Sequence, residues 1–186
     1  MTEPDPTMTR IGRGLELSQN GEREAARAVF TQVWSDMSGL SGDPFHRCAL
    51  AHSMADVQEN VHDELLWDLR ALEAAHQITD ERAAQAGVTS PVAGFYPSLH
   101  LNLGECYRKL GNLDLAHEHL KRGQTAVGAL SDDGHGHMIK GGLDRLGEQV
   151  GVRLKVRNPV RARRFHRKPI LMRCSPSADS PPGLVP

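Results

Sequence analysis

The chain of 186 residues is poor in aromatic side chains, since Phe, Trp and Tyr together make up 4% of it. A folded core must therefore be built mostly from Leu, Ala, Val and Ile. No apolar run approaches the ~18 residues that a membrane-spanning helix requires, and the mean hydropathy is −0.44. The N-terminus lacks the positively charged start and the apolar segment of a secretory signal. We therefore expect neither membrane insertion nor secretion.

Cysteine is also scarce. The three cysteines, Cys48, Cys106 and Cys174, lie far apart in the sequence. An odd number of cysteines at such spacings fits neither a disulfide framework nor a cysteine-based zinc site. Free cysteine is among the most frequently buried residue types. We therefore expect Cys48 and Cys106 in the core, and the protein in the reducing cytoplasm.

Acidic residues are missing from a long stretch near the C-terminus, because no Asp or Glu lies between Glu148 and Asp179. Residues 153–186 hold 9 Lys and Arg and one acid, whereas residues 1–152 hold 13 Lys and Arg and 22 acids. The net charge of −1 therefore conceals an acidic body and a basic tail. Such asymmetry is typical of a terminal segment that behaves differently from the body.

No segment alternates polar and apolar residues for long enough to form a sheet. Apolar residues instead recur at spacings of three and four, as in Ala26, Phe30 and Val33. Between such runs lie helix-breaking and helix-starting signals, among them Asp43-Pro44, an N-cap followed by proline at the first helical position. The pattern predicts an all-α fold of short antiparallel helix pairs.

Residues 101–123 carry a repeat signature and resemble a tetratricopeptide repeat. The matching residues are Leu103, Gly104, Tyr107, Gly111, Ala116, Leu120 and Gly123. The N-terminal pair resembles the same repeat through Gly14, Leu17, Gly21, Ala26, Phe30 and Val33, with Arg13 in place of the usual leucine. In the middle pair Cys48-Ala49 takes the corresponding place, and His52 replaces the usual aromatic residue.

The resemblance covers about residues 9–130 and implies helix pairs stacked as a short right-handed superhelix. Three blocks, one of them Phe45–Asp56, are also similar to small bacterial repeat proteins, a group with which we associate no activity. A helix after the last repeat is expected to cap the array. The predicted organisation is a flexible N-terminus (1–8), a helical domain (9–152) and a tail (153–186). The domain holds repeats at about 9–40, 43–78 and 97–130, an insertion at 79–94 and a capping helix at 136–150. The tail is first basic and then Pro- and Ser-rich and disordered.

The resemblance implies a non-catalytic interaction module, a scaffold or adaptor that binds a partner protein or peptide in a groove lined by the first helix of each pair. Carried over position by position, the predicted groove residues are His46, Leu50, Ser53, Met54, Leu101, Glu105, Arg108 and Lys109. Arg108-Lys109 is similar to the basic pair with which some family members hold a C-terminal carboxylate. The matching positions lack the asparagine of such a clamp, and ordinary solvated charges are the alternative.

The basic tail allows a different reading, a regulator that associates with nucleic acid. Its arginines and lysines have the density that suits phosphate contacts. The residues in question are Arg161, Arg163, Arg164, Arg167 and Lys168. The same charge would suit acidic lipid, and two other interpretations stay open, that the tail folds back on the acidic body or that it has no selected role.

The chain holds 10 histidines, and four residues suggest a metal site: His46, His52, Asp56 and His100. Their spacing is no recognised zinc signature, so packing and hydrogen bonding are the expected roles, and we predict no metal and no cofactor. Phosphate-binding glycine loops, dinucleotide fingerprints and the Gly-x-Ser-x-Gly motif are all missing from the sequence. We therefore expect no enzymatic activity.

Overall fold

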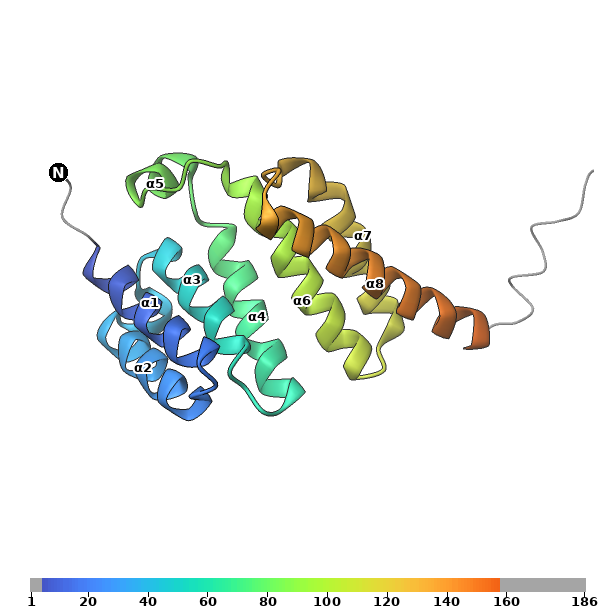
Figure 1. Cartoon of the computed structure of the whole chain (residues 1–186), viewed down its shortest axis with the longest axis horizontal. Helices are drawn as coiled ribbons and strands as arrows, with labels where there is room; N and C mark the ends of the chain where they lie inside the picture. Colours follow the sequence, from blue (N-terminus) through green and yellow to red (C-terminus); the bar gives the residue numbers. More distant parts are fainter. Residues whose placement is uncertain (1–4, 158–186) are drawn as a thin grey trace, which may run out of the picture.

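The computed structural model describes residues 5–157, and within that range every regular element is a helix (Figure 1). The predicted all-α class is confirmed. The α-helices are α1 (Pro6–Gln19), α2 (Arg23–Asp36), α3 (Pro44–Ala55), α4 (Val61–Ala75), α5 (Asp80–Gln85), α6 (Tyr96–Lys109), α7 (Leu113–Ala126) and α8 (Gly134–Arg157). Three 3-10 helices lie in the connections: η1 (Gly39–Ser41), η2 (Val92–Phe95) and η3 (Val127–Ala129). No helix in the described range has the length and apolar character to cross a membrane.

Helices that are consecutive in the chain pack as pairs. α1 packs on α2, α3 on α4, and α6 on α7, while α4 also lies against α6. The pairs follow one another along the long axis of the molecule, and α8 runs across α6 and α7 (Figure 1). The predicted arrangement of antiparallel helix pairs in sequence order is therefore confirmed.

Local capping explains where the helices begin. The Asp5 carboxylate accepts hydrogen bonds from the backbone N–H groups of Thr7 and Met8, so α1 begins at Pro6, three residues before the predicted start of the first repeat. Asp43 caps α3 in the same way, and this N-cap was predicted from the Asp-Pro pair. A side-chain oxygen accepting orphan N–H groups, followed by proline at the first helical position, is a strong helix start.

Small residues let neighbouring helices approach closely. A Cβ atom on Gly14 would overlap the ring of Phe30 on α2. One on Gly104 would lie 2.6 Å from a methyl carbon of Leu146 on α8, and 3.5 Å from the carbonyl oxygen of Ala116 on α7. These glycines are therefore packing positions, as their place in the repeat signature predicted.

The core is divided into three clusters that follow the stacking. The first joins α1, α2 and α3 around Phe30 and Leu50. The second joins α3, α4 and α6 around Ala51 and Leu103. The third joins α7 and α8 around Leu143. Each helix pair therefore buries its apolar face against the next pair, as stacked arrays require.

The middle pair packs in a register two residues later than the sequence predicted. The repeat signature placed Ala49 at the small position that Gly14 and Gly104 hold in the other pairs. In the structure Ala51 is fully buried in a core with Ala71 of α4, whereas Ala49 is half-buried and lines a pocket. The alignment of Cys48-Ala49 with the repeat signature is therefore wrong.

The segment after the last pair is longer than predicted. The expected capping helix at 136–150 is α8, which begins at Gly134 and continues to Arg157. Residues 153–157, the start of the predicted basic tail, are therefore helical. The predicted nucleic-acid residues lie outside the described residues: Arg161, Arg163, Arg164, Arg167 and Lys168.

Candidate functional site

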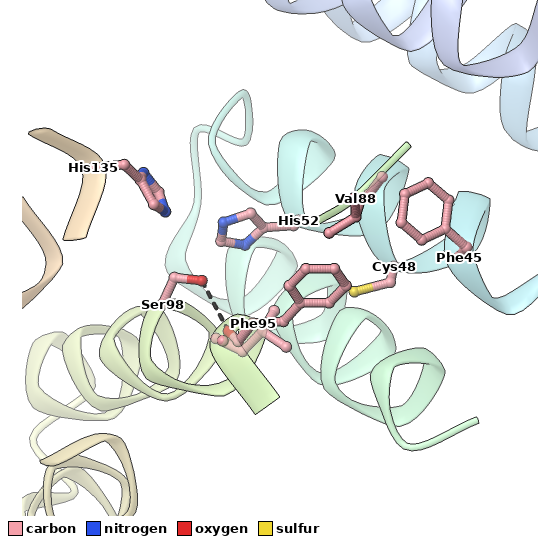
Figure 2. Close-up of a pocket in the computed structure, with 10 residues that line it drawn as sticks. Phe45, Cys48, His52, Val88, Phe95, Ser98 and His135 are labelled. Carbon is pink, nitrogen blue, oxygen red and sulfur yellow. Dashed lines mark hydrogen bonds between the residues drawn. The ribbon is translucent and has the colours of Figure 1, made fainter. Parts of the chain in front are cut away.

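A pocket of about 290 Å³ opens between the first helices of the second and third pairs (Figure 2). Four parts of the chain contribute to it: α3, the connection after α5 with η2, the start of α6, and the start of α8. The lining residues are Phe45, Cys48, Ala49, His52, Val88, Gly94, Phe95, Ser98, Leu99 and His135. Most of these side chains are apolar, so the pocket suits an apolar group.

Helical spacing explains how α3 forms one wall. Phe45, Cys48 and His52 are three and four residues apart, which places them on one face of the helix. They line the pocket together, and the close-up shows the ring of His52 extending toward the same space as the ring of Phe95 (Figure 2). This face of α3 would lie against solvent without the second wall that η2 and α6 supply.

The predicted insertion at 79–94 closes one side of the pocket and is anchored to α3. The Arg82 guanidinium donates two hydrogen bonds to the Asp43 carboxylate, at 2.9 and 3.0 Å, and lies 5.1 Å from the ring centre of Phe45. Within the insertion, the Asp80 carboxylate accepts from the Val92 N–H at 2.8 Å. The insertion is therefore part of the site, with a fixed position.

The polar groups of the pocket are largely occupied or inert. The Ser98 hydroxyl donates to the Phe95 carbonyl at 2.9 Å (Figure 2). Burial raises the pKa of the Cys48 thiol to about 12. The thiolate is the nucleophilic form of cysteine, so Cys48 has no appreciable nucleophilicity at neutral pH.

His52 is the polar group that connects the pocket to the interior. Its side chain is 33% exposed on the pocket side, while its Nδ1 atom is buried, has no hydrogen-bond partner and lies 3.9 Å from Asp68 Oδ1. Burial by itself would lower the pKa of His52, but the carboxylates of Asp68 and Asp56 outweigh it and raise the pKa. The imidazolium form is therefore favoured.

Behind His52 lies a group of polar side chains from α4 and α6, the inter-pair cluster: Glu64, Asp68, Asn102, Cys106 and Lys109. Asp68 is fully buried and accepts hydrogen bonds from Asn102 Nδ2 at 3.4 Å and Cys106 Sγ at 3.5 Å. Lys109 Nζ donates to both oxygens of Glu64 at 2.7 and 2.8 Å. Burial and the neighbouring carboxylates raise the pKa of Cys106, so its thiol is protonated.

Three of the predicted groove residues lie inside the protein. Leu50 and Met54 are buried in the core formed with α1 and α2, and Ser53 is buried with its hydroxyl donating to the Ala49 carbonyl. These residues offer no surface that a partner could contact, which corrects their predicted placement. The two-residue change of register is the cause, since it turns Cys48 and His52 toward the pocket instead.

The other predicted groove residues are already engaged with neighbours. His46 Nε2 lies 2.7 Å from Asp5 Oδ2, and Leu101 packs against α8. Arg108 pairs with Glu105 at 2.7 Å, whereas Lys109 belongs to the inter-pair cluster. Neither cation of the predicted carboxylate clamp is therefore a free charge.

The predicted metal group does not come together. His46 pairs with Asp5, and His100 Nδ1 lies 3.1 Å from His119 Nδ1 inside the third helix pair, so hydrogen bonding accounts for both. Asp56 is exposed at the end of α3. The group of metal-ligand side chains that does converge within residues 5–157 is Glu64, Asp68 and Cys106.

Sequence reasoning missed Asp68, although the sequence carried a signal for it. Asp68 stands on the face of α4 that also carries Ala71, Leu72 and Ala75, where a charged residue is out of place unless it has a partner. His135 and Phe95 gave no such signal, because their place in the pocket depends on how distant segments meet.

Comparison with family models, with curated proteins and with solved structures found no match for this chain. The described residues therefore define its class by fold: an all-helical protein of paired antiparallel helices.

Proposed function

We propose that the protein is a non-catalytic interaction module that holds an extended segment of a partner protein across α3 and α6. The observation that carries this proposal is the apolar pocket between these two helices. It receives one apolar side chain of the partner. The repeat resemblance supports the same face, because first helices of successive pairs line the binding groove of such arrays.

The size and lining of the pocket favour a side chain over a cofactor. Pockets that enclose whole small molecules are roughly 300–1,000 Å³, and this one, at about 290 Å³, is at the lower limit. The inert thiol of Cys48 and the occupied hydroxyl of Ser98 argue against catalysis there. His52, which favours its charged form, adds a donor for a carbonyl or carboxylate beside the apolar side chain.

We also infer that the three pairs and α8 form a short right-handed superhelix of the tetratricopeptide type, with α8 as its cap. The close approaches at Gly14, Gly104 and Gly123 support this inference, since all three occupy the small positions of the repeat signature. Ala51 fills the same position in the middle pair once its register is corrected.

A pocket-filling variant tests the binding mode. Peptides are selected on the wild-type chain from a displayed random library, and the affinity of the best peptide is measured by fluorescence anisotropy. We expect Ala49→Trp to weaken binding at least about tenfold, because the indole occupies the space of one buried side chain. Leu66→Trp is the matched control, since Leu66 is 46% exposed on α4 and outside the pocket.

Thermal unfolding of both variants shows whether the fold is kept. Selected peptides should share an apolar residue whose replacement by Ser abolishes binding. Enrichment of no peptide, or equal affinity for wild type and Ala49→Trp, would remove the support for this function.

A further inference from the structure

The inter-pair cluster brings together side chains that commonly bind metal ions. The carboxylate oxygens of Glu64 and Asp68 and the Sγ atom of Cys106 all lie within 4.8 Å of one another. Glu64 and Asp68 are one turn apart on α4, and Cys106 faces them from α6. The cluster therefore joins the second helix pair to the third.

Asp68 is only weakly charge-compensated for a buried carboxylate, because the imidazole of His52 lies 3.9 Å from its Oδ1 atom, beyond hydrogen-bond distance. It has no exposed surface, and its two hydrogen-bond donors, Asn102 and Cys106, are neutral and distant at 3.4 and 3.5 Å. The nearby lysine, Lys109, bonds to Glu64 instead. A buried charge is costly when its opposite charge is not in hydrogen-bond contact with it.

A second observation points to the same place. Within residues 5–157, His52 Nδ1 is the one fully buried side-chain nitrogen or oxygen without a hydrogen-bond partner. It lies 3.9 Å from Asp68 Oδ1, so this nitrogen is on the cluster side of the ring while the exposed part of the ring lines the pocket. A buried imidazole nitrogen without a hydrogen-bond partner, next to the Asp68 carboxylate, is an available metal ligand once it is deprotonated.

We propose that the inter-pair cluster is a binding site for a divalent transition-metal ion of the zinc type, held by His52 Nδ1, Cys106 Sγ and carboxylate oxygens of Asp68 and Glu64. One nitrogen, one sulfur and two oxygens form a four-coordinate set that suits Zn²⁺. The sulfur and nitrogen ligands disfavour Mg²⁺ and Ca²⁺, which prefer oxygen.

Binding requires three local changes. The Cys106 thiol and the His52 imidazolium each release a proton to solvent as the metal–sulfur and metal–nitrogen bonds form. Lys109, whose side chain is 39% exposed, turns away from Glu64 into solvent. Neighbouring ligand atoms of a tetrahedral zinc ion lie roughly 3.3–3.8 Å apart. The ligand atoms of Glu64, Asp68 and Cys106, which lie within 4.8 Å of one another, therefore approach by up to about 1 Å, and the His52 ring moves toward them. The bound ion compensates the charge of Asp68 and ties α3, α4 and α6 together.

Cobalt is the spectroscopic probe for this site. The full chain is purified without a histidine tag, in a Cys174→Ser background, and stripped with a chelator. We expect one equivalent of Co²⁺ to produce the near-ultraviolet charge-transfer band of a cobalt–thiolate bond, and Zn²⁺ to abolish it. Exposed histidines that bind Co²⁺ elsewhere give no such band, because it requires a thiolate ligand.

The two buried cysteines give a matched pair of variants. Cys106→Ser should remove the band and weaken zinc binding at least about tenfold, whereas Cys48→Ser should leave both unchanged. Lys109→Ala should tighten zinc binding, because it frees Glu64. If Cys106→Ser does not fold, loss of the band in His52→Ala takes its place as the decisive result.

No thiolate band in the wild type, a band that survives Cys106→Ser, or equal losses in Cys48→Ser and Cys106→Ser would overturn the proposal. The same holds for a band that His52→Ala leaves unchanged. This site does not depend on the proposed binding function, because the readouts are metal affinity and cobalt absorption and involve no partner.

Discussion

His100 and His119 form a buried pair whose surroundings favour the neutral form of both imidazoles. Their Nδ1 atoms are 3.1 Å apart, and both rings are buried between α6 and α7, with Tyr107 stacked on His119. One Nδ1 donates and the other accepts, so the hydrogen bond requires the accepting ring to be neutral. Burial, the second imidazole, Arg122 and His76 lower the pKa of His100 to about 4, and burial followed by Arg122 lowers the pKa of His119.

This pair predicts acid sensitivity of the fold. The folded-state pKa of His100 lies below the unfolded value of 6.5, so the folded protein binds fewer protons and loses stability as the pH falls from about 6.5 toward 4. We expect His100 alone to account for a loss of about 2 kcal/mol between pH 7.5 and pH 5. Urea unfolding at the two pH values measures it, with His100→Leu as the comparison. An equal loss in His100→Leu would show that other groups cause the effect.

At the scale of the element, helix contacts depend on small residues at single positions. Gly14 and Gly12 lie on the same helix, α1, yet their surroundings differ. A Cβ atom on Gly14 would enter the ring of Phe30, while one on Gly12 would meet nothing within 4 Å. The sequence carried part of this difference, because only Gly14 stands at a small position of the repeat signature.

The two glycines therefore predict opposite effects of the same substitution. Gly14→Ala should destabilise the protein by about 1–3 kcal/mol, because overpacking forces α1 and α2 apart. Gly12→Ala should stabilise it by about 0.5–1 kcal/mol, because alanine is the better helix former. Denaturant unfolding at pH 7.5 measures both changes. A stabilising Gly14→Ala would show that the α1–α2 contact is looser than the structure has it.

At the scale of the whole molecule, the charge is unevenly divided along the chain. The residues up to 152 are acidic, and most of the basic excess lies beyond Arg157, the last described residue. The alternative function, association with nucleic acid through the tail, stays a prediction. The end of α8 indicates where the chain should be truncated to test it. A chain cut at 152 would lose the last residues of α8, whereas a cut after Arg157 removes only residues 158–186.

The truncation after Arg157 tests the alternative function. Six Lys and Arg lie in residues 158–186. If all six contact phosphates, the logarithm of the binding constant for duplex DNA should fall with the logarithm of salt with a slope near −5. Titration of labelled DNA at several salt concentrations measures it for the full chain and for residues 1–157. Salt-insensitive binding, or equal binding by both chains, would rule out the tail as the nucleic-acid site.

The sequence by itself determined the helix pairs, because capping, helix breaking and apolar spacing act between residues that are close along the chain. Asp43-Pro44 starts α3 wherever that helix lies, and Gly14 marks a close contact within its own hairpin, with Phe30 of α2. The tertiary structure decided the register of the middle pair, the pocket and the inter-pair cluster. Ala51 faces α4, and His52 lies between the pocket and Asp68, because helices distant in sequence meet there. Contacts of that kind depend on the packing of whole faces, which local sequence patterns do not encode.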